Sequence, residues 1–315
     1  MSYAKVIVPL DGSELSESAL PLACAVGRAS HAEVLLVRVG AAGVATTGLS
    51  AALAGPVRGP VRSMPGPADA PALRAGDRPA GLAEERRYLG RVAASLVHAG
   101  AQVSLEAVAG DPPEEILGLA RREHADLIVM ATHGRSGLAR SVLGSVTDRV
   151  ALHSTVPVLA VRPYSAPAQR PDNSGVIVRT VLVPLDQSEL SESAIPHAVA
   201  IAGIFQAWIT LVTVVKPGAG PSQADAAKQY LMAIAARTGI PESRVSIVVN
   251  TGDPASEIPL QLKLLPHAMV VMTTRGASGL KRWIRGSVTD AVIRDGLVPT
   301  MVVPPVAPLL GPAIH

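Results

Sequence analysis

The chain alternates short apolar runs with longer segments in which apolar and polar residues recur at helical spacing. Lys5 to Leu10 has the sequence KVIVPL, and Glu33 to Val39 has the sequence EVLLVRV. Comparable runs cover residues 102–109, 126–131 and 157–162. Runs of this length, rich in β-branched residues, are typical of strands buried within a parallel sheet. The pattern therefore predicts five strands in the first half of the chain.

Segments between these runs predict helices. One begins after Ser13, a favourable N-cap residue, and continues to about Arg28, with Pro21 expected to kink it. Another covers Leu82 to His98, and a third begins near Pro112, where proline followed by acidic residues suits a helix N-terminus. Strands alternating with helices favour an α/β fold with a parallel sheet, right-handed crossovers and helices on both faces.

The same pattern occurs a second time. Residues 9–19 (PLDGSELSESA) and 184–194 (PLDQSELSESA) agree at ten of eleven positions, at an offset of 175 residues. Gly134 and Gly276 are offset by only 142 residues, so the first copy contains 33 extra residues (175 minus 142). We therefore predict one domain that has been duplicated. The expected organisation is a first domain at 1–163 with an insertion at 40–80, a linker at 164–177 and a second domain at 178–306.

Two loops in each copy follow predicted strand ends and carry chemically distinctive residues. Asp11 follows the first strand, and a loop of small residues around Gly134 follows the fourth. In open α/β sheets ligands bind beyond the carboxyl ends of the strands. If the first and fourth strands are neighbours, both loops face one crevice. Asp11 and its counterpart Asp186 then either accept hydrogen bonds from a nucleoside or cap the helix that follows.

The loop after the fourth strand suits phosphate. It leads into a helix that begins at Gly144-Ser145, and a helix N-terminus offers backbone N–H groups and a favourable dipole to an anion. Arg135 adds positive charge, whereas Val39 and Met130, at strand ends, are candidates for apolar contact with a base. Because Gln187 stands at the position of Gly12, we do not expect that position to need a positive φ.

Composition excludes several classes of protein. The net charge of +3 and the aromatic content of 2% argue against a nucleic-acid binder. No apolar run has the length of a membrane span, and no secretory signal pattern is present, so we expect a cytoplasmic protein. The single cysteine, Cys24, fits a reducing compartment.

Known catalytic and metal-binding patterns are absent from the sequence. It has no G-x-x-x-x-G-K-[ST] or G-x-G-x-x-G loop. We find no His/Cys/Asp cluster with metal-ligand spacing and no nucleophile–base pair. His133 corresponds to Arg275 in the second copy, which argues against a general base at that position. No catalytic residue and no metal ligand is therefore assigned.

The segments VIVPLDGSELSESAL, DLIVMATHGRSG and GSVTDRV resemble the universal stress protein family in its tandem two-domain form. ATP-binding members carry a small residue, two residues, Gly, nine residues, and Gly-Ser/Thr. Here Ala131, Gly134 and Gly144-Ser145 match this pattern, and Thr273, Gly276 and Gly286-Ser287 match it in the second copy. Both copies depart at the first position, where glycine is usual. We expect the first copy to be the main site, because Thr273 is β-branched.

The resemblance implies a five-stranded parallel sheet of order 3-2-1-4-5 in each copy. It also implies binding of ATP or another adenine nucleotide, often with Mg²⁺ or Mn²⁺, and dimerisation through the fifth strands. In a tandem chain the two copies can pair with each other by that edge. The candidate nucleotide-binding residues are Pro9, Leu10, Asp11, Gly12, Val39, Met130, Ala131, Gly134, Arg135, Gly137, Gly144, Ser145, Val146 and Thr147, and in the second copy Pro184, Leu185, Asp186, Val214, Met272, Thr273, Gly276, Gly279, Gly286, Ser287, Val288 and Thr289.

Three functions fit these residues. The first is an ATP-binding stress-response module in which occupancy regulates conformation or partner binding. The second is an enzyme with slow ATP hydrolysis or nucleotidyl transfer. The third is a nucleotide-free structural or chaperone-like protein. The sequence favours the first, with slow turnover at most.

Overall fold

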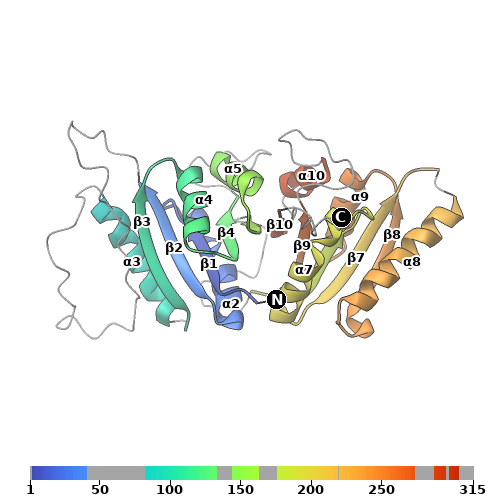
Figure 1. Ribbon diagram of the computed structural model, residues 1–315, viewed down its shortest axis with the longest axis horizontal. Helices are drawn as coiled ribbons and strands as arrows, with labels where there is room; N and C mark the ends of the chain where they lie inside the picture. Colours follow the sequence, from blue (N-terminus) through green and yellow to red (C-terminus); the bar gives the residue numbers. More distant parts are fainter. Residues whose placement is uncertain are drawn as a thin grey trace, which may run out of the picture.

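The apolar runs form ten strands of one sheet in the computed structural model (Figure 1). The structure describes residues 2–40, 82–98, 100–132, 144–162, 176–218, 220–273, 287–295 and 298–304. Most of the insertion at 40–80, most of the linker at 164–177 and the glycine loops around Gly134 and Gly276 lie outside these ranges.

Each copy contributes five strands and a set of helices. The strands are β1 (Lys5–Pro9), β2 (Glu33–Gly40), β3 (Gln102–Ala109), β4 (Leu127–Ala131), β5 (Val158–Val161), β6 (Thr180–Pro184), β7 (Trp208–Val215), β8 (Val245–Thr251), β9 (Ala268–Thr273) and β10 (Thr300–Val303). The helices are α1 (Glu14–Glu17), α2 (Leu20–Ser30), α3 (Ala83–His98), α4 (Pro112–Arg122), α5 (Ser145–His153), α6 (Glu189–Glu192), α7 (Ile195–Phe205), α8 (Pro221–Arg237), α9 (Pro254–Lys263) and α10 (Ser287–Asp295), with a short 3-10 helix at Glu242–Arg244.

The strand order is β3-β2-β1-β4-β5-β10-β9-β6-β7-β8. Each half therefore has the order 3-2-1-4-5, and all pairs within a half are parallel. This confirms the fold expected from the sequence. Because β1 lies beside both β2 and β4, the loops after the first and fourth strands leave the sheet at the same edge, where the strand order reverses.

The two copies are joined by their fifth strands. β5 and β10 pair in antiparallel fashion, with Leu159 opposite Met301 and Val158 opposite Val302. The pairing that the resemblance implied is thus made within this chain, and it converts two five-stranded sheets into one. β5 and β10 would each be an edge strand with unpaired backbone groups, and each covers the edge of the other.

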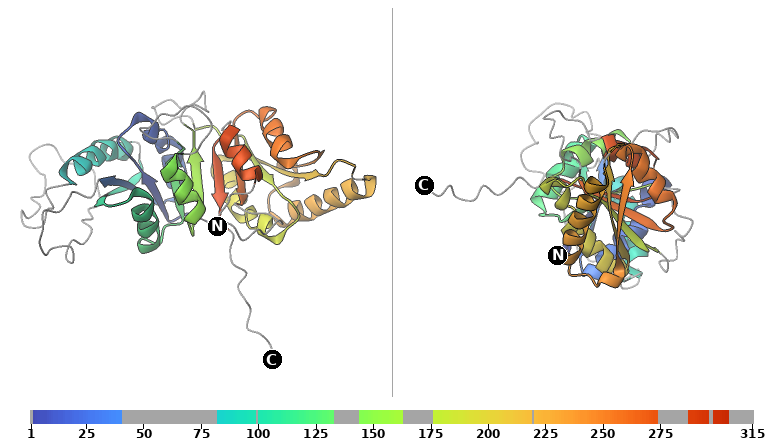
Figure 2. Two further views of the ribbon diagram at one scale, coloured as in Figure 1. Left: turned by 90° about the horizontal axis from the view of Figure 1, so that it is seen from above. Right: turned by 90° about the vertical axis from the view of Figure 1, so that its right-hand side faces the viewer.

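The hydrophobic core differs between the two faces of the sheet. On one face α2, α3, α7 and α8 cover a single core cluster that runs through both copies. On the other face α4 with α5, and α9 with α10, cover two separate clusters. Figures 1 and 2 show this arrangement, with α2 and α7 on one side of the sheet and α5 and α10 on the opposite side. The copies therefore share a core on one face only.

One predicted helix is interrupted. The segment after Ser13 was expected to form a kinked helix to about Arg28, but it forms the short helix α1 and then α2. Pro21 lies in the first turn of α2, where its missing N–H costs no intrahelical hydrogen bond. Pro196 occupies the same place in α7. In the second copy the sequence pattern predicts strands at 180–185, 209–215, 268–273 and 299–303, but it does not locate the third strand, β8.

Two residues connect the copies beside the β5–β10 pair. The Tyr3 hydroxyl lies 3.3 Å from Nδ1 of His197, and it also donates to the sulfur of Met301 at 3.8 Å. Tyr3 is 1% exposed and His197 is 7% exposed. The residues related to this pair by the repeat are Val178 and Leu22, which are both buried and apolar. The contact between copies therefore has a polar pair on one side and an apolar pair on the other.

Acidification is expected to weaken this contact. Burial, and secondarily the positive N-terminus, lowers the pKa of His197 below its ordinary value. The folded state favours neutral imidazole, so its contribution to stability is complete above the pKa of an unfolded histidine, about 6.5. That contribution is lost as the pH falls from there towards the folded pKa.

The variant His197→Leu, which copies Leu22, is expected to flatten the dependence of melting temperature on pH between about pH 7.5 and about pH 5. An unchanged slope in His197→Leu would contradict the assignment.

Candidate functional site

A hollow of about 280 Å³ opens where the strand order of the first copy reverses. The loop after β1, the ends of β2 and β4, and the first turns of α4 and α5 meet around it. Its lining residues are Pro9, Leu10, Asp11, Ser16, Val37, Val39, Pro112, Ile116, Met130, Ala131, Gly144, Ser145, Val146 and Thr147. Sequence candidates from four separate segments, 9–11, 39, 130–131 and 144–147, are thus brought together.

Four lining residues were not predicted from the sequence: Ser16, Val37, Pro112 and Ile116. Val37 lies two residues before Val39 on the same face of β2, so strand alternation carried a signal for it. Ile116 lies one helical turn after Pro112 in α4. Together with Leu10 and Met130, Val37 and Ile116 make much of the lining apolar.

The start of α5 also lines the hollow. Gly144 is the N-cap residue of this helix, and its N–H donates to the carbonyl of Thr132 at 2.6 Å. The first N–H groups of an α-helix have no partner within the helix and carry a partial positive charge. Ser145, Val146 and Thr147 contribute this first turn. The arrangement suits a negatively charged group.

Thr147 holds that turn in place. Its side chain is buried, and Oγ1 donates to the carbonyl of Ala131 at 2.8 Å. In the second copy Oγ1 of Thr289 donates to the carbonyl of Thr273 at 3.1 Å. Each threonine therefore fixes the helix N-terminus against the end of the fourth strand.

Asp11 both lines the hollow and supports the next helix. Its Oδ1 accepts hydrogen bonds from the N–H of Ser13 at 2.9 Å and from the Ser13 hydroxyl at 2.6 Å. Ser13, not Asp11, is the N-cap of α1, because its hydroxyl accepts from the N–H of Ser16 at 3.2 Å. The alternative that Asp11 itself caps the helix was therefore wrong: Asp11 holds Ser13, and Ser13 caps the helix. Asp186 and Ser188 repeat the arrangement in the second copy.

Gly12 corrects one expectation. Its φ is 85°, and Gln187 at the equivalent position also has a positive φ, 65°. The expectation that this position needs no positive φ was therefore wrong, because glutamine here accepts a conformation that is usually left to glycine. Gly12 is described by the structure but is not among the residues that line the hollow.

Substitutions at this position are expected to act in opposite directions. Gly12→Gln should lower the free energy of unfolding by about 1 kcal/mol, because a side chain at positive φ is strained. Gln187→Gly relieves the same strain, although the freedom of glycine in the unfolded chain offsets part of the gain. Urea unfolding of both variants measures the difference. A loss in Gln187→Gly as large as that in Gly12→Gln would contradict the strain argument.

The described lining offers few ligands for a divalent cation. Among the described residues, Asp11 is the only carboxylate that lines the hollow, and no group of three or more His, Cys, Asp or Glu side chains is placed to hold a metal ion. Mg²⁺ is commonly bound by one or two carboxylates together with phosphates and water. The residues present therefore fit a cation carried mainly by the phosphates of a ligand.

The second copy repeats this lining. Thirteen of the fourteen lining positions carry the same residue at offsets of 175 before the insertion and 142 after it. The exception is Ala131, which corresponds to Thr273, a buried residue at the end of β9. Ser287 opens α10. The other described candidates of the second copy occupy the corresponding strand ends and helix turn: Pro184, Leu185, Asp186, Val214, Met272, Thr273, Val288 and Thr289.

The remaining candidates lie outside the described residues. They are Gly134, Arg135 and Gly137 in the first copy, and Gly276, Gly279 and Gly286 in the second. In the part of the chain that the structure describes, no helix is long and apolar enough to cross a membrane.

Comparison with known proteins gives one family. The model of the universal stress protein family matches residues 2–162 and again residues 178–304. Universal stress protein YxiE of Bacillus subtilis is 32% identical over 160 residues, covering 51% of this chain and 99% of that protein. Universal stress protein MJ0531 of Methanocaldococcus jannaschii is 30% identical over 160 residues, covering 51% of this chain and 82% of that protein.

A solved structure extends the likeness to the whole fold. The crystal structure of a universal stress protein from Archaeoglobus fulgidus has a TM-score of 0.66 and 21% identity, and the match covers 96% of each chain. At this identity the likeness establishes the fold alone. The family model, however, matches most of the chain in two successive segments. The chain therefore belongs to the universal stress protein family, with two of the family's domains in tandem.

Proposed function

We propose that this protein binds adenine nucleotide, with ATP as the main ligand, in the hollow of the first copy, and that occupancy regulates its conformation or its partners during stress. The observation that carries the proposal is that apolar residues of the strand ends and the N-terminus of α5 line one hollow. A nucleotide combines the same two characters, with an apolar base at one end and phosphates at the other.

The proposal assigns each group of lining residues to one part of the nucleotide. Val37, Val39 and Met130 contact the base. Asp11 accepts hydrogen bonds from the ribose or the base, because a carboxylate beside phosphates is unfavourable without a cation. The amides of the first turn of α5 face the phosphates. Gly134 and Arg135, which lie outside the described residues, are assigned to the phosphates as well.

Binding, with slow turnover at most, is the proposed activity. Among the described lining residues the titratable side chain is Asp11, and it is already held by Ser13 through Oδ1. No histidine or lysine in that lining is placed to act as a general base. Within the proposal the protein acts in the cytoplasm and binds neither nucleic acid nor membrane.

The purified protein provides the first test. Denaturing it and analysing the supernatant is expected to release adenine nucleotide carried through purification. Isothermal titration of nucleotide-free protein with ATP, AMP and cyclic AMP then measures affinity. A micromolar site corresponds to about 8 kcal/mol and is readily measured at about 100 μM protein. No bound nucleotide and no heat from any of the three ligands would refute the proposal and favour a structural role.

Turnover is tested separately. Phosphate release from ATP is expected to be slow compared with ordinary enzymes, whose median turnover is about 10 per second. Release at such ordinary rates, lost in a Gly144→Trp variant, would identify an ATPase in place of a regulatory binding module.

A further inference from the structure

A second hollow lies in the second copy, at the strand ends opposite the nucleotide side. It has a volume of about 350 Å³ and is formed where β6 and β7 begin and α7 ends. Two of its residues are large, apolar and unusually exposed: Ile177 at 45% and Trp208 at 49%. We call it the Trp208 hollow. Its lining residues are Val176, Ile177, Val178, Arg179, Phe205, Gln206 and Trp208.

The first copy has polar residues at the same places. At an offset of 175, Ile177 corresponds to Ser2, Phe205 to Ser30 and Trp208 to Glu33. The backbone is shared, since Gln206 and its counterpart His31 are both left-handed, with φ of 53° and 55°. Three apolar residues in the second copy thus stand where the first copy has two serines and a glutamate.

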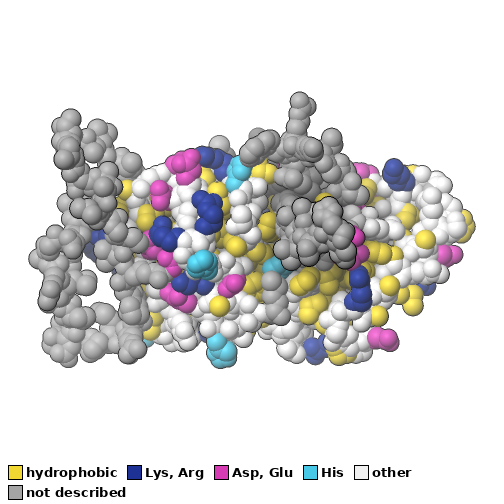
Figure 3. All heavy atoms as spheres, in the orientation of Figure 1, with side chains coloured by type: hydrophobic (Ala, Val, Ile, Leu, Met, Phe, Trp, Pro, Cys, Tyr) yellow, Lys and Arg dark blue, Asp and Glu magenta, His cyan; other side chains and the backbone are white. Residues whose placement is uncertain are grey.

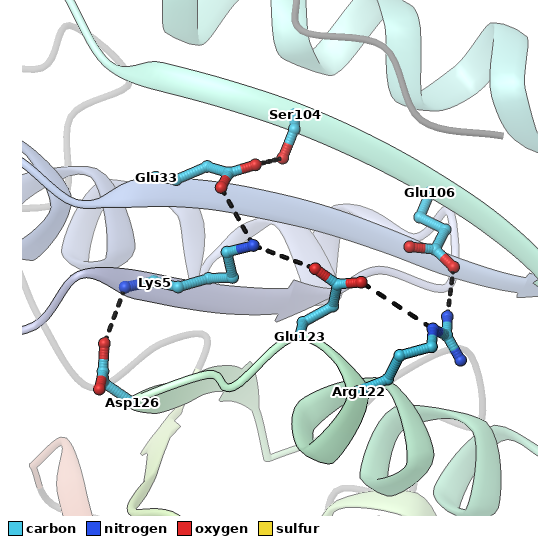
Figure 4. Close-up of polar contacts among 7 residues, drawn as sticks. All are labelled: Lys5, Glu33, Ser104, Glu106, Arg122, Glu123 and Asp126. Carbon is cyan, nitrogen blue, oxygen red and sulfur yellow. Dashed lines mark hydrogen bonds and ion pairs between the residues drawn. The ribbon is translucent and has the colours of Figure 1, made fainter. Parts of the chain in front are cut away.

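In the first copy this glutamate belongs to an ion network (Figure 4). Nζ of Lys5 lies 3.2 Å from Glu33 and 3.0 Å from Glu123, and Ser104 donates to Glu33. The network continues to Arg122, which donates to the buried carboxylate of Glu106 at 2.5 Å. Lys5, Glu33, Glu123 and Arg122 therefore pair with one another, whereas Oε2 of Glu106 is buried without a hydrogen-bond partner.

Five of the seven residues drawn in Figure 4 correspond to apolar residues in the second copy, whereas Lys5 and Ser104 correspond to Thr180 and Ser246. Glu33, Glu123 and Asp126 correspond to Trp208, Leu265 and Ala268. Leu264, at the position of Arg122, is 74% exposed. Figure 3 shows the same contrast more broadly: charged side chains of both signs gather over the first copy, and apolar side chains gather where Figure 1 places α7. Exposed apolar clusters of this kind mark interaction sites.

The charge that remains beside the Trp208 hollow is positive. Arg179 is exposed in its lining and stands where the first copy has Ala4. Arg244 approaches from the other side, where its guanidinium donates to Oε1 of Gln206 at 3.1 Å. The described lining contains no carboxylate. Compared with the first copy, this end of the second copy lacks three carboxylates and also the two cations Lys5 and Arg122. It has Arg179 and Arg244 where the first copy has Ala4 and Gln102, so the balance of charge here is more positive.

We propose that the Trp208 hollow is a docking site for a polypeptide segment of another protein that carries a leucine-like side chain next to a carboxylate. The apolar side chain packs between Ile177, Phe205 and Trp208, and the carboxylate pairs with Arg179. Tryptophan and arginine are the residues that most often dominate binding at protein interfaces. The site lies apart from the nucleotide hollow and does not depend on nucleotide binding.

Fluorescence anisotropy with defined peptides tests the proposal on the full-length protein. The probe is a fluorescein-labelled peptide of alternating Leu and Glu; the comparison peptides alternate Leu with Lys and Ser with Glu. Saturable binding of the Leu/Glu peptide alone is expected. Trp208→Glu, which copies Glu33, should weaken it by roughly tenfold or more. Arg179→Ala, which copies Ala4, should weaken it a few-fold, and less at high salt.

A matched control variant is available in Met232→Glu. Met232 is 55% exposed on α8 and is not among the residues of the hollow, so this substitution should leave binding unchanged. Melting temperature and circular dichroism verify that each variant is folded. Absence of saturable binding, equal binding of the Leu/Lys peptide, or an equal loss in Met232→Glu would overturn the proposal. So would a wild-type dimer in sedimentation that Trp208→Glu abolishes, because the occupant would then be a second copy of this chain.

Discussion

Gly144→Trp is expected to lower the affinity of the first copy for ATP by at least about 100-fold, which corresponds to about 3 kcal/mol. Gly144 is the N-cap of α5 and lines the hollow, with its N–H tied to Thr132 at 2.6 Å. An indole on this residue has to enter the hollow or displace the first turn of the helix. Either outcome removes the amides assigned to the phosphates. Isothermal titration with ATP measures the loss.

The second copy supplies the matched control. Gly286→Trp makes the same change after β9, where Thr273 replaces Ala131 as the one difference between the linings. We expect Gly144→Trp to remove more of the bound nucleotide than Gly286→Trp does, because a β-branched residue narrows the second site. Equal losses would show that Thr273 is accommodated and that both copies bind alike.

Met301→Ala is expected to lower the free energy of unfolding by about 2–5 kcal/mol. Met301 is fully buried in β10, opposite Leu159 of β5, and its sulfur accepts from the Tyr3 hydroxyl. The substitution leaves a cavity at the contact between the copies, where the surroundings belong to both halves of the chain. Chemical unfolding followed by circular dichroism measures the change.

Met232→Ala is the control for this variant. The residue type and the substitution are the same, but Met232 is 55% exposed on α8, so its truncation should change stability by less than about 0.5 kcal/mol. A cost at Met301 no larger than the cost at Met232 would mean that the contact between the copies contributes little to stability.

The sequence predicted the strands well where burial is uniform. β1, β2, β4 and β9 lie between helices on both faces, so nearly all their residues are apolar and the runs stand out. β8 was not located, because its residues are mostly half-buried and mixed in character. β3, the strand at the other end of the sheet, is more deeply buried and was located. The strand order followed from the family resemblance, since local patterns carry little information on which strands are neighbours.

The candidate site was predicted in outline from residues that are unusual for their position. Asp11 and Gly144 stand out because a buried-strand pattern gives way to a carboxylate or a glycine. Val37 and Ile116 did not stand out in the sequence, because valine and isoleucine are equally common in any hydrophobic core. The positive φ of Gln187 was also hidden, since a glutamine gives no local signal of a left-handed backbone.

The antiparallel pair between β5 and β10 has a consequence for how the protein responds to its own concentration. Two separate chains that meet at such an edge come apart on dilution, because their association obeys mass action. Here both partners belong to one polypeptide, so their effective concentration is set by the connection between them and not by the amount of protein in the cell. The ten-stranded sheet is therefore complete in every molecule, however few molecules are made.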